Sequence, residues 1–399
     1  MNDAAETRLP KHSRVIIWGG WYGSRNIGDR LLLLTITDML YEAFGNVEFT
    51  ILSANPDLVK EYFKSPEGTT YQVIEPKKQL LKLIAAIIRC NLIIFGGGVP
   101  FFDQYKQAFY MLFLVSFARL FKKPYFLWCC ASLQIDHKIN RSIYRYVIDH
   151  AVKTTCRDRY TCEVFSKLGI KSDTVIVPDS AFSLTHYDDR DARRLINSYI
   201  PNSDEKKLFA LTPRTLRIKS TEAQAHYNEK TSDDIQHQYQ VYSIALDWLL
   251  ENGYLPVFVP MNTNPPDDDR LIAKLIIENS KRGNEAVIID EMIMPRTAPA
   301  LYSYFAGSLV SRVHGGVTSF LGLCPPIMYA FERKHMGIME SMGLDDLIFT
   351  VDKSAEEIID YLLRLEKDNL QIRETIKNKR NSLVKDAVIP CQYIAEFFK

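Results

Sequence analysis

Two residues that could bind an anion and move a proton, Arg312 and His314, lie close together in an apolar stretch of the chain. A guanidinium holds a carboxylate or a phosphate, and an imidazole titrates near neutral pH, so it can give or take a proton. The pair suits a phosphorylated, carboxylated substrate that also needs a proton transferred. The structural alternative is that Arg312 pairs with a carboxylate of the protein and His314 caps a helix.

The sequence around this pair predicts a strand, a tight junction, a helix and a second strand. Leu309–Val313 is short and β-branched, Gly315 and Gly316 are expected at a sharp exit, and Val317–Leu323 continues as a helix that Pro325 ends. This pattern indicates a βαβ unit of a parallel sheet. Its junction is the carboxyl end of a strand and the N-terminus of a helix, which is where such sheets bind anions.

A second candidate site follows the first expected strand, Arg14–Trp18. The glycine-rich segment Gly19–Asp29 leads into an apolar helix, Leu31–Phe44, and permits close approach of a ligand. It is neither a dinucleotide fingerprint nor a P-loop, because no Gly-Lys-Ser/Thr follows. Asn26 and Asp29 could hydrogen-bond sugar hydroxyls; the structural alternative is a turn at Asn26 and a helix cap at Asp29.

Three consecutive glycines, Gly96–Gly98, follow another expected strand, Asn91–Phe95, and precede Asp103. They indicate backbone packed against a ligand or another loop. In the second half, the expected strand Leu208–Thr212 runs into Arg214, which therefore also lies at the carboxyl end of a strand.

The length of 399 residues suggests two domains of about 200 residues each. A composition of 47% hydrophobic and 24% charged residues is typical of a globular enzyme. The net charge of +1 gives no bulk field that favours nucleic acid. Seven scattered cysteines without a CxxC pair, and no secretory signal, predict reduced thiols in a cytoplasmic protein.

No segment is expected to span a membrane. Leu80–Phe102 is apolar but is interrupted by Lys82 and Arg89, and Phe109–Ala118 is too short, so both are expected to be buried. A peripheral contact at the inner face of the membrane through Phe121-Lys122-Lys123 stays open beside a solvated helix end.

The order of these motifs resembles the polysaccharide pyruvyl transferase family, whose members transfer the enolpyruvyl carbons of phosphoenolpyruvate to a sugar and usually form a pyruvate ketal. The resemblance rests on Ser311-Arg312-Val313-His314 with the helix, proline and strand after it, and on Gly20–Asp29. The Gly-Gly-Gly loop and Arg157-Asp158 with a later Pro-Asp fit the same family. Arg30 departs from it, since an acidic residue usually follows that Asp.

The resemblance implies an α/β fold of the glycosyltransferase-B type, with two Rossmann-like domains facing across a cleft. We expect residues 1–195 to form the acceptor domain and residues 205–385 the donor domain. The charged, turn-rich segment Thr185–Asp204 is expected to be the linker, with the boundary near residues 190–205. Residues 386–399 are expected to pack back on the first domain.

The resemblance further implies phosphoenolpyruvate as donor and a saccharide of a cell-surface polysaccharide, free or lipid-linked, as acceptor, with no metal or cofactor. His314 is the expected catalytic residue. The expected donor-binding residues are Arg214, Arg312, Val313, Gly315 and Lys334, with Arg217 as the alternative to Arg214. The expected acceptor-binding residues are Tyr22, Asn26, Asp29, Gly97, Gly98 and Asp103.

Two other functions remain open. The spacing of Glu332 and Glu340 matches that of a motif in some retaining glycosyltransferases, which use nucleotide sugars. A non-catalytic glycan-binding relative is favoured slightly by Arg30. Asp267–Asp269 invites a metal interpretation, but the helix that follows favours an acidic first turn.

Overall fold

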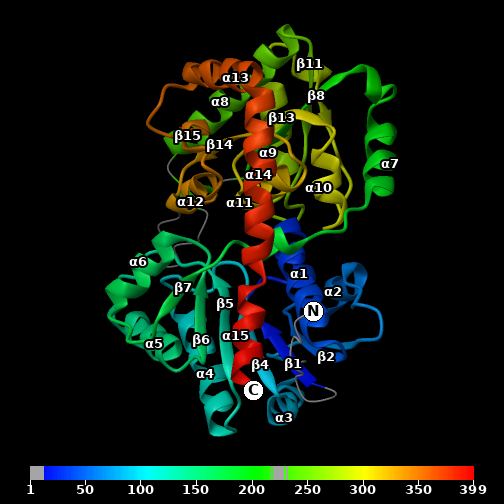
Figure 1. Cartoon of the computed structure of the whole chain (residues 1–399). Helices are drawn as coiled ribbons and strands as arrows, with labels where there is room; N and C mark the ends of the chain where they lie inside the picture. Colours follow the sequence, from blue (N-terminus) through cyan, green and yellow to red (C-terminus); the bar gives the residue numbers. More distant parts are fainter. Residues whose placement is uncertain (1–12, 216, 219–228, 231) are drawn as a thin grey trace. The chain divides into compact units, whose positions relative to one another are not determined.

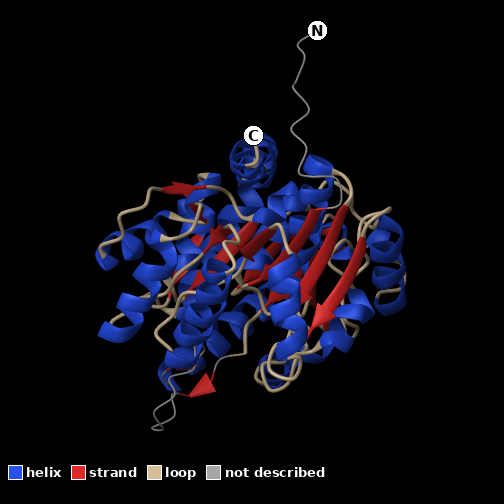
Figure 2. Cartoon of the chain, turned by 90° about the horizontal axis from the view of Figure 1, so that it is seen from below, coloured by secondary structure: helices blue, strands red, loops and turns tan. Residues whose placement is uncertain are grey.

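The computed structural model describes residues 13–215, 217–218, 229–230 and 232–399 (Figure 1). The chain divides into two compact units. The first comprises the residues up to Ser24, Gly28–Leu184 and Leu383–Lys399; the second comprises Arg25–Ile27 and Thr185–Ser382. Each unit contains a parallel sheet accompanied by helices, and the strands and helices can be distinguished in Figure 2.

The first unit contains a seven-stranded sheet with the order β3-β2-β1-β4-β5-β6-β7, and every pair of neighbours is parallel. The chain adds strands on one side of β1 and then, from β4 onward, on the other. The carboxyl ends of β1 and β4 therefore flank the point where the strand order reverses, which is the usual ligand site of such a sheet. The strands are β1 Ser13–Trp18, β2 Val47–Leu52, β3 Thr70–Ile74, β4 Leu92–Gly96, β5 Tyr125–Cys130, β6 Lys153–Cys156 and β7 Thr174–Ile176.

The central strands of this sheet are buried throughout, as β4 and β5 show, because helices cover a parallel sheet and its strands become continuous apolar runs. Helix α6 shows local signals at both ends: Asp158 accepts a hydrogen bond from the Thr161 N–H at 2.7 Å, and Gly169 ends the helix with φ 73°. The helices are α1 Ile27–Phe44, α2 Pro56–Tyr62, α3 Leu80–Arg89, α4 Tyr105–Leu120, α5 Lys138–Asp149, α6 Arg159–Leu168 and α15 Ile389–Phe397.

The second unit repeats the plan with a six-stranded parallel sheet, β12-β11-β8-β13-β14-β15, whose strand order reverses between β8 and β13. A separate parallel pair is formed by β9 and β10. The strands are β8 Lys207–Thr212, β9 Arg217–Ile218, β10 Glu229–Lys230, β11 Tyr254–Phe258, β12 Val287–Ile288, β13 Phe305–Val310, β14 Pro326–Ala330 and β15 Ile348–Thr350. The helices are α7 Asp189–Tyr199, α8 Ser232–Glu251, α9 Asp269–Glu278, α10 Thr297–Tyr302, α11 Val313–Leu321, α12 Arg333–Met342, α13 Ile358–Lys367 and α14 Asn369–Ala387.

Helix α14 begins in the second unit, and its residues from Leu383 onward belong to the first. The helix after it, α15, packs within the first unit: the Cys391 thiol donates to the Met39 carbonyl at 3.6 Å, and the Phe397 ring lies 5.9 Å from that of Phe126. None of the helices among the described residues is long and apolar enough to cross a membrane.

The prediction that Gly315 and Gly316 form the exit from a strand is wrong. β13 ends at Val310, and both glycines lie inside α11. A Cβ on Gly315 would lie 3.3 Å from the Thr212 methyl carbon, and a Cβ on Gly316 would lie 2.7 Å from the Met328 methyl carbon. The glycines therefore let the helix pack closely on the sheet, and turn geometry is not what requires them.

The segment expected to be a turn-rich linker also differs from the prediction, because α7 occupies Asp189–Tyr199 and belongs to the second unit. The Asp188 side chain caps it by accepting from the Asp191 N–H at 2.9 Å. The many charged residues of this segment led to the prediction of a linker, although it forms a helix. The apolar side of the helix is buried and consists of Ala192, Leu195 and Ile196.

Candidate active site

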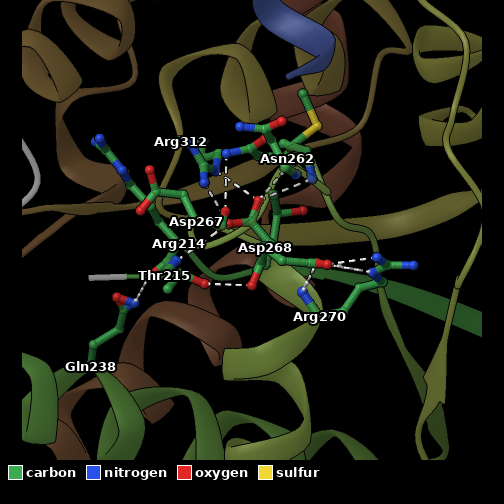
Figure 3. A network of polar contacts seen from close by, with 12 residues as sticks. Arg214, Thr215, Gln238, Asn262, Asp267, Asp268, Arg270 and Arg312 are labelled. Carbon is green, nitrogen blue, oxygen red and sulfur yellow. Dashed lines mark hydrogen bonds and ion pairs between the residues drawn. The ribbon is translucent and has the colours of Figure 1, made fainter. Parts of the chain in front are cut away.

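The loops after β8 and β13 lie together where the second sheet reverses its strand order. The Ser311 N–H donates to the Thr212 carbonyl at 2.9 Å, which joins the two loops directly. The Tyr242 hydroxyl reaches both as well, at 2.7 Å from Ser311 Oγ and 3.2 Å from the Thr212 carbonyl oxygen. Arg214 and Arg312 follow these two positions and come from neighbouring strand ends (Figure 3).

Arg312 is held by a carboxylate that the sequence did not single out for this purpose. Its Nε donates to Asp269 Oδ2 at 2.7 Å and its Nη2 to Oδ1 at 2.5 Å, and both side chains are buried. Asp269 also accepts from the N–H groups of Asn262 at 2.9 Å, Met261 at 3.2 Å and Thr215 at 3.3 Å. The two-pronged contact fixes the plane of the guanidinium, and the third nitrogen, Nη1, takes no part in it.

Burial raises the pKa of the Asp269 carboxyl, whereas Arg312 and the backbone donors oppose that rise. We interpret the pair as charged, because a guanidinium stays protonated and two hydrogen bonds to it stabilise a carboxylate. The structural alternative considered for Arg312, a pairing with a carboxylate of the protein, is therefore present. The contact leaves the guanidinium in a fixed orientation at the start of α11.

Arg312 is the N-cap residue of α11, and His314 is the second residue of the helix. The His314 side chain is half-buried, and its carbonyl accepts from Thr318 Oγ1 at 2.8 Å. The close packing of Gly315 on Thr212 brings the start of α11 to the end of β8. Helix N-termini present unpaired N–H groups and the positive end of the helix dipole, so this position favours an anion.

Arg214 extends this cationic region toward the end of β14. Its side chain is buried, and its guanidinium carbon lies 5.5 Å from the centre of the Phe331 ring. Its backbone carbonyl accepts from Gln238 Nε2 at 2.9 Å, which ties the loop to α8 (Figure 3).

Glu332 lies near several basic side chains at the end of β14. It is the N-cap residue of α12, and Lys334 Nζ lies 2.5 Å from its Oε2. Burial alone would raise the pKa of Glu332, but Lys334, Arg214 and His335 lower it to about 2. The carboxylate is therefore ionised at neutral pH and partly balances the lysine and the arginine.

The structure thus brings most of the predicted donor-binding residues to three adjacent strand ends, namely Arg214, Arg312, Val313, Gly315 and Lys334. Arg217 lies in β9. Asp269 and Glu332 were missed as neighbours of this cluster. Asp269 was expected only as part of an acidic helix start, and no local spacing indicates which arginine a carboxylate will meet.

The glycine loops of the first unit also converge. A Cβ on Gly19 would lie 3.0 Å from the Gly96 nitrogen, and one on Gly98 would lie 3.9 Å from Gly20 Cα and from Asp29 Oδ1. Gly97 and Gly98 have φ values of 72° and 70°, which favour glycine. The Asp29 carboxylate also accepts from Ser24 Oγ at 3.2 Å.

Three other residues predicted to bind the acceptor are engaged within the protein. Tyr22 is buried, and its hydroxyl donates to the Gly96 carbonyl, whereas its neighbour Trp21 is 70% exposed. The Asp103 carboxylate accepts from three donors at the start of α5: the N–H groups of Asp136 and His137, both at 2.9 Å, and Asn140 Nδ2 at 2.7 Å. Asn26 pairs with Asn262 in an isolated antiparallel bridge.

Arg30, the residue that departs from the family resemblance, is fully buried, and its guanidinium carbon lies 5.4 Å from the centre of the Tyr62 ring.

The two glutamates whose spacing matches a glycosyltransferase motif, Glu332 and Glu340, differ in their surroundings. Glu340 is exposed on α12, whereas Glu332 forms an ion pair with Lys334. Asp268 pairs with Arg270 at 2.6 Å (Figure 3). Both Asp268 and Asp269, at the start of α9, therefore have arginine partners.

Solved structures with a similar fold confirm the predicted class, a two-domain α/β protein of the glycosyltransferase-B type. Sucrose-phosphate synthase from Thermosynechococcus elongatus has a TM-score of 0.61 at 12% identity over 97% of this chain and 99% of its own. HepE from Anabaena, in complex with UDP and glucose, has a TM-score of 0.57 at 11% identity over the same shares. MnaA from S. aureus, in complex with UDP, has a TM-score of 0.56 at 13% identity over 92% and 90%.

The sequence itself matches the model of one family, polysaccharide pyruvyl transferase, over residues 26–332. The match spans most of the chain and includes the loops that follow β8, β11 and β13. The chain belongs to the polysaccharide pyruvyl transferase family.

Proposed function

We propose that this protein transfers the pyruvyl group of phosphoenolpyruvate to a saccharide and forms a pyruvate ketal. Family membership supports the reaction class. The observation that carries the donor assignment is the buried cationic cluster at the ends of β8, β13 and β14, with Arg312 fixed by Asp269 at a helix N-terminus. Phosphoenolpyruvate carries a phosphate and a carboxylate, which require cationic partners of this kind.

In this proposal, Arg312 and the N–H groups at the start of α11 bind one anionic group of the donor, and Arg214 and Lys334 bind the other. Arg217, in β9, is the alternative partner. The orientation of Arg312 is set before the donor arrives, because Asp269 already holds two of its nitrogens. Preorganised charge of this kind stabilises a charged transition state without reorganisation.

The proposed chemistry starts with a proton added to the methylene carbon of phosphoenolpyruvate, which makes the neighbouring carbon electrophilic. A sugar hydroxyl attacks that carbon and loses its proton. The bond to the phosphate oxygen then breaks, and inorganic phosphate leaves with both bonding electrons. A second hydroxyl of the sugar attacks the same carbon and loses its proton, which closes the ketal. Of the two protons lost, one replaces the proton given to the methylene carbon and the other is carried by phosphate.

His314 is the residue that we propose transfers a proton in these steps. It lies one residue beyond Val313 at the start of α11, beside the guanidinium that would bind the donor. An imidazole has a reference pKa of about 6.5, so it can act as general acid in one step and as general base in another. The scheme uses no metal or cofactor.

The acceptor is proposed to be a sugar of a cell-surface polysaccharide or of its lipid-linked precursor, bound at the glycine loops of the first unit. Asp29, Gly97 and Gly98 converge there, and the exposed Trp21 offers an aromatic face for a sugar ring. Tyr22 and Asp103 support this region through their internal hydrogen bonds.

The proposal is tested by measuring phosphate release from phosphoenolpyruvate in the presence of candidate saccharides. We expect release that depends on the acceptor, together with a pyruvate-sized mass increase of the sugar. His314→Gln should lower turnover by roughly 10²-fold or more while phosphoenolpyruvate still raises the melting temperature. Full turnover in this variant would remove His314 from the chemistry.

The same experiment distinguishes the nucleotide-sugar alternative. HepE, a similar structure, was solved with UDP-glucose. If UDP-glucose raises the melting temperature and phosphoenolpyruvate does not, the proposed donor is wrong. Stabilisation by phosphoenolpyruvate without phosphate release for any saccharide would favour a non-catalytic relative.

A further inference from the structure

A surface of the first unit combines exposed apolar side chains with an excess of positive charge. It consists of the outward sides of α3 and α4, which pack against one another and against the same core. We call it the α3–α4 face. Its exposed apolar residues are Leu80, Leu81, Ile88, Tyr105, Phe109 and Leu120. Neither the proposed chemistry nor the proposed acceptor loops use them.

Helix α4 is apolar on two opposite sides. One side, including Met111 and Val115, is fully buried in the core. On the outward side, Tyr105, Phe109 and Leu120 are exposed at helical spacing, with half-buried aromatic residues between them. The outward side of a helix in a soluble protein normally carries polar residues, whereas α4 exposes these apolar side chains beside Lys106 and Arg119.

Helix α3 repeats the pattern over a shorter length. Leu83 and Ile87 are buried against the sheet, whereas Leu81 is 83% exposed and Ile88 is 47% exposed. Exposed apolar side chains on two helices that pack against one another indicate a site of interaction with a protein or a membrane.

The charge of this face indicates which partner it fits. The segment from Lys77 to Lys123 contains eight Lys or Arg residues and one acidic residue, Asp103, in a chain whose net charge is +1. Asp103 therefore offsets only one of these eight positive charges. The basic residues are Lys77, Lys78, Lys82, Arg89, Lys106, Arg119, Lys122 and Lys123, and all but Lys123 are exposed. Lys78 pairs with Glu75, just before this segment, at 3.2 Å, so the other seven carry the positive excess.

We propose that the α3–α4 face binds the surface of a lipid bilayer that contains anionic lipids. The leucine, isoleucine and phenylalanine side chains would enter the boundary between headgroups and acyl chains, and the lysines would reach the lipid phosphates. A second copy of the chain is a poorer partner for this face, since a symmetric contact would place lysines against lysines. The inference goes beyond the proposed transfer reaction and needs no donor or acceptor for its test.

The test is flotation of the full-length protein with vesicles of phosphatidylcholine alone and of phosphatidylcholine with about one third phosphatidylglycerol. We expect partition into the anionic vesicles to exceed that into neutral vesicles by at least tenfold and to fall as salt is raised. Lys82→Glu should lower partition by roughly tenfold, because each basic residue near an anionic surface contributes about fivefold and the reversal adds repulsion. Leu81→Asp should lower it by at least tenfold.

Two matched variants of the second unit serve as controls. Leu370 is 81% exposed on α14, so Leu370→Asp makes the same change as Leu81→Asp at nearly the same exposure. Lys379 is also exposed on α14, so Lys379→Glu matches Lys82→Glu. We expect both controls to bind vesicles like the unaltered protein. All four positions are exposed, so the melting temperatures should be unchanged.

Equal partition into neutral and anionic vesicles, or equal losses in the control variants, would overturn the inference. It would also be overturned if light scattering showed a dimer that Leu81→Asp dissociates, because the face would then be an interface between copies. Phosphate release with a free saccharide acceptor should be unchanged in Leu81→Asp, so failure of the proposed reaction and failure of membrane binding give different results.

Discussion

The two sheets of this protein share a topology but differ in what stands at the point where the strand order reverses. In the first unit the loops after β1 and β4 are glycines in close backbone contact. In the second unit the loops after β8 and β13 carry Arg214 and Arg312, with carboxylates around them. The same fold therefore supplies a wall of glycine backbone in one unit and a cluster of charged side chains in the other. Topology locates a site, and the side chains decide what it binds.

The largest expected effect tests whether the charge of the second site depends on its internal partner. Asp269→Ala should lower the free energy of unfolding by about 3–5 kcal/mol, because it leaves the buried Arg312 guanidinium without its carboxylate. Asp268→Ala, next to it, should cost only about 1 kcal/mol, since Arg270 is partly exposed and the main loss is a helix cap.

Chemical denaturation at neutral pH measures both values. Replacing the pair together, as Asp269→Leu with Arg312→Met, should recover the part of the loss that comes from the unpaired guanidinium, but not the part that comes from the N–H groups of Met261, Asn262 and Thr215, and phosphoenolpyruvate binding should be lost. Equal losses for the two aspartates would show that the pair does not organise the site.

The second prediction tests whether the second unit binds the donor and the first unit binds the acceptor. Arg214→Met should raise the KM for phosphoenolpyruvate by about 10–100-fold and leave the acceptor KM unchanged, because a hydrogen bond between charged groups is lost. Trp21→Ala should instead raise the acceptor KM by about tenfold, because an exposed aromatic platform is removed. Steady-state phosphate release with each substrate varied in turn measures the split. An effect of Arg214→Met on the acceptor KM alone would reverse the assignment of the two units.

The third prediction concerns the carboxylate that balances the charged site. The folded-state pKa of Glu332 is about 2, below its ordinary value of 4.5, so its ionisation stabilises the fold above about pH 4.5 and that contribution is lost as pH falls toward 2. Glu332→Gln should therefore cost about 2 kcal/mol at pH 7, and the difference should shrink below pH 4.5.

Unfolding curves recorded between pH 3 and pH 7 follow this difference. Glu340→Gln, on the exposed side of the same helix, should change stability by less than about 0.5 kcal/mol at every pH. A loss for Glu332→Gln that does not vary with pH would assign it to packing.

The smallest expected effect concerns the glycine wall. Gly97 and Gly45 both have φ 72°. A Cβ on Gly97 would lie 3.0 Å from the Leu32 side chain, whereas a Cβ on Gly45 would have no other atom within 4 Å among the described residues. Gly45→Ala should cost about 1 kcal/mol for backbone strain, and Gly97→Ala should cost about 1 kcal/mol more for the contact. Thermal unfolding measures the difference, and equal losses would mean that the loop relaxes around the added methyl.

Periodicity and glycine punctuation predicted most of the fold. The apolar runs that became β4, β5 and β8 could be placed because strands of a covered parallel sheet are continuously apolar. Charged helices were harder: α7 was taken for a linker, since its buried side is narrow and its other residues are those of a loop.

The site residues that lie together on one loop could be predicted from the sequence. The residues that a second, distant loop contributes could not. Arg312 and His314 could be found from one junction. Asp269 meets Arg312 across a separation of 43 residues, and no single-sequence pattern encodes that contact. Tyr22 was predicted to bind the acceptor, but it and Trp21 are adjacent aromatic residues of one loop, and only packing shows that the first is buried and the second exposed.

The assignment of α15 to the first unit has a consequence for synthesis of the chain. Residues up to Leu184 emerge from the ribosome early, but the Met39 and Phe126 contacts are made by Cys391 and Phe397, near the end of the sequence printed above. The first unit must therefore wait through translation of the whole second unit before its last helix arrives. Until then the surface that α15 will cover stays open to water and to chaperones.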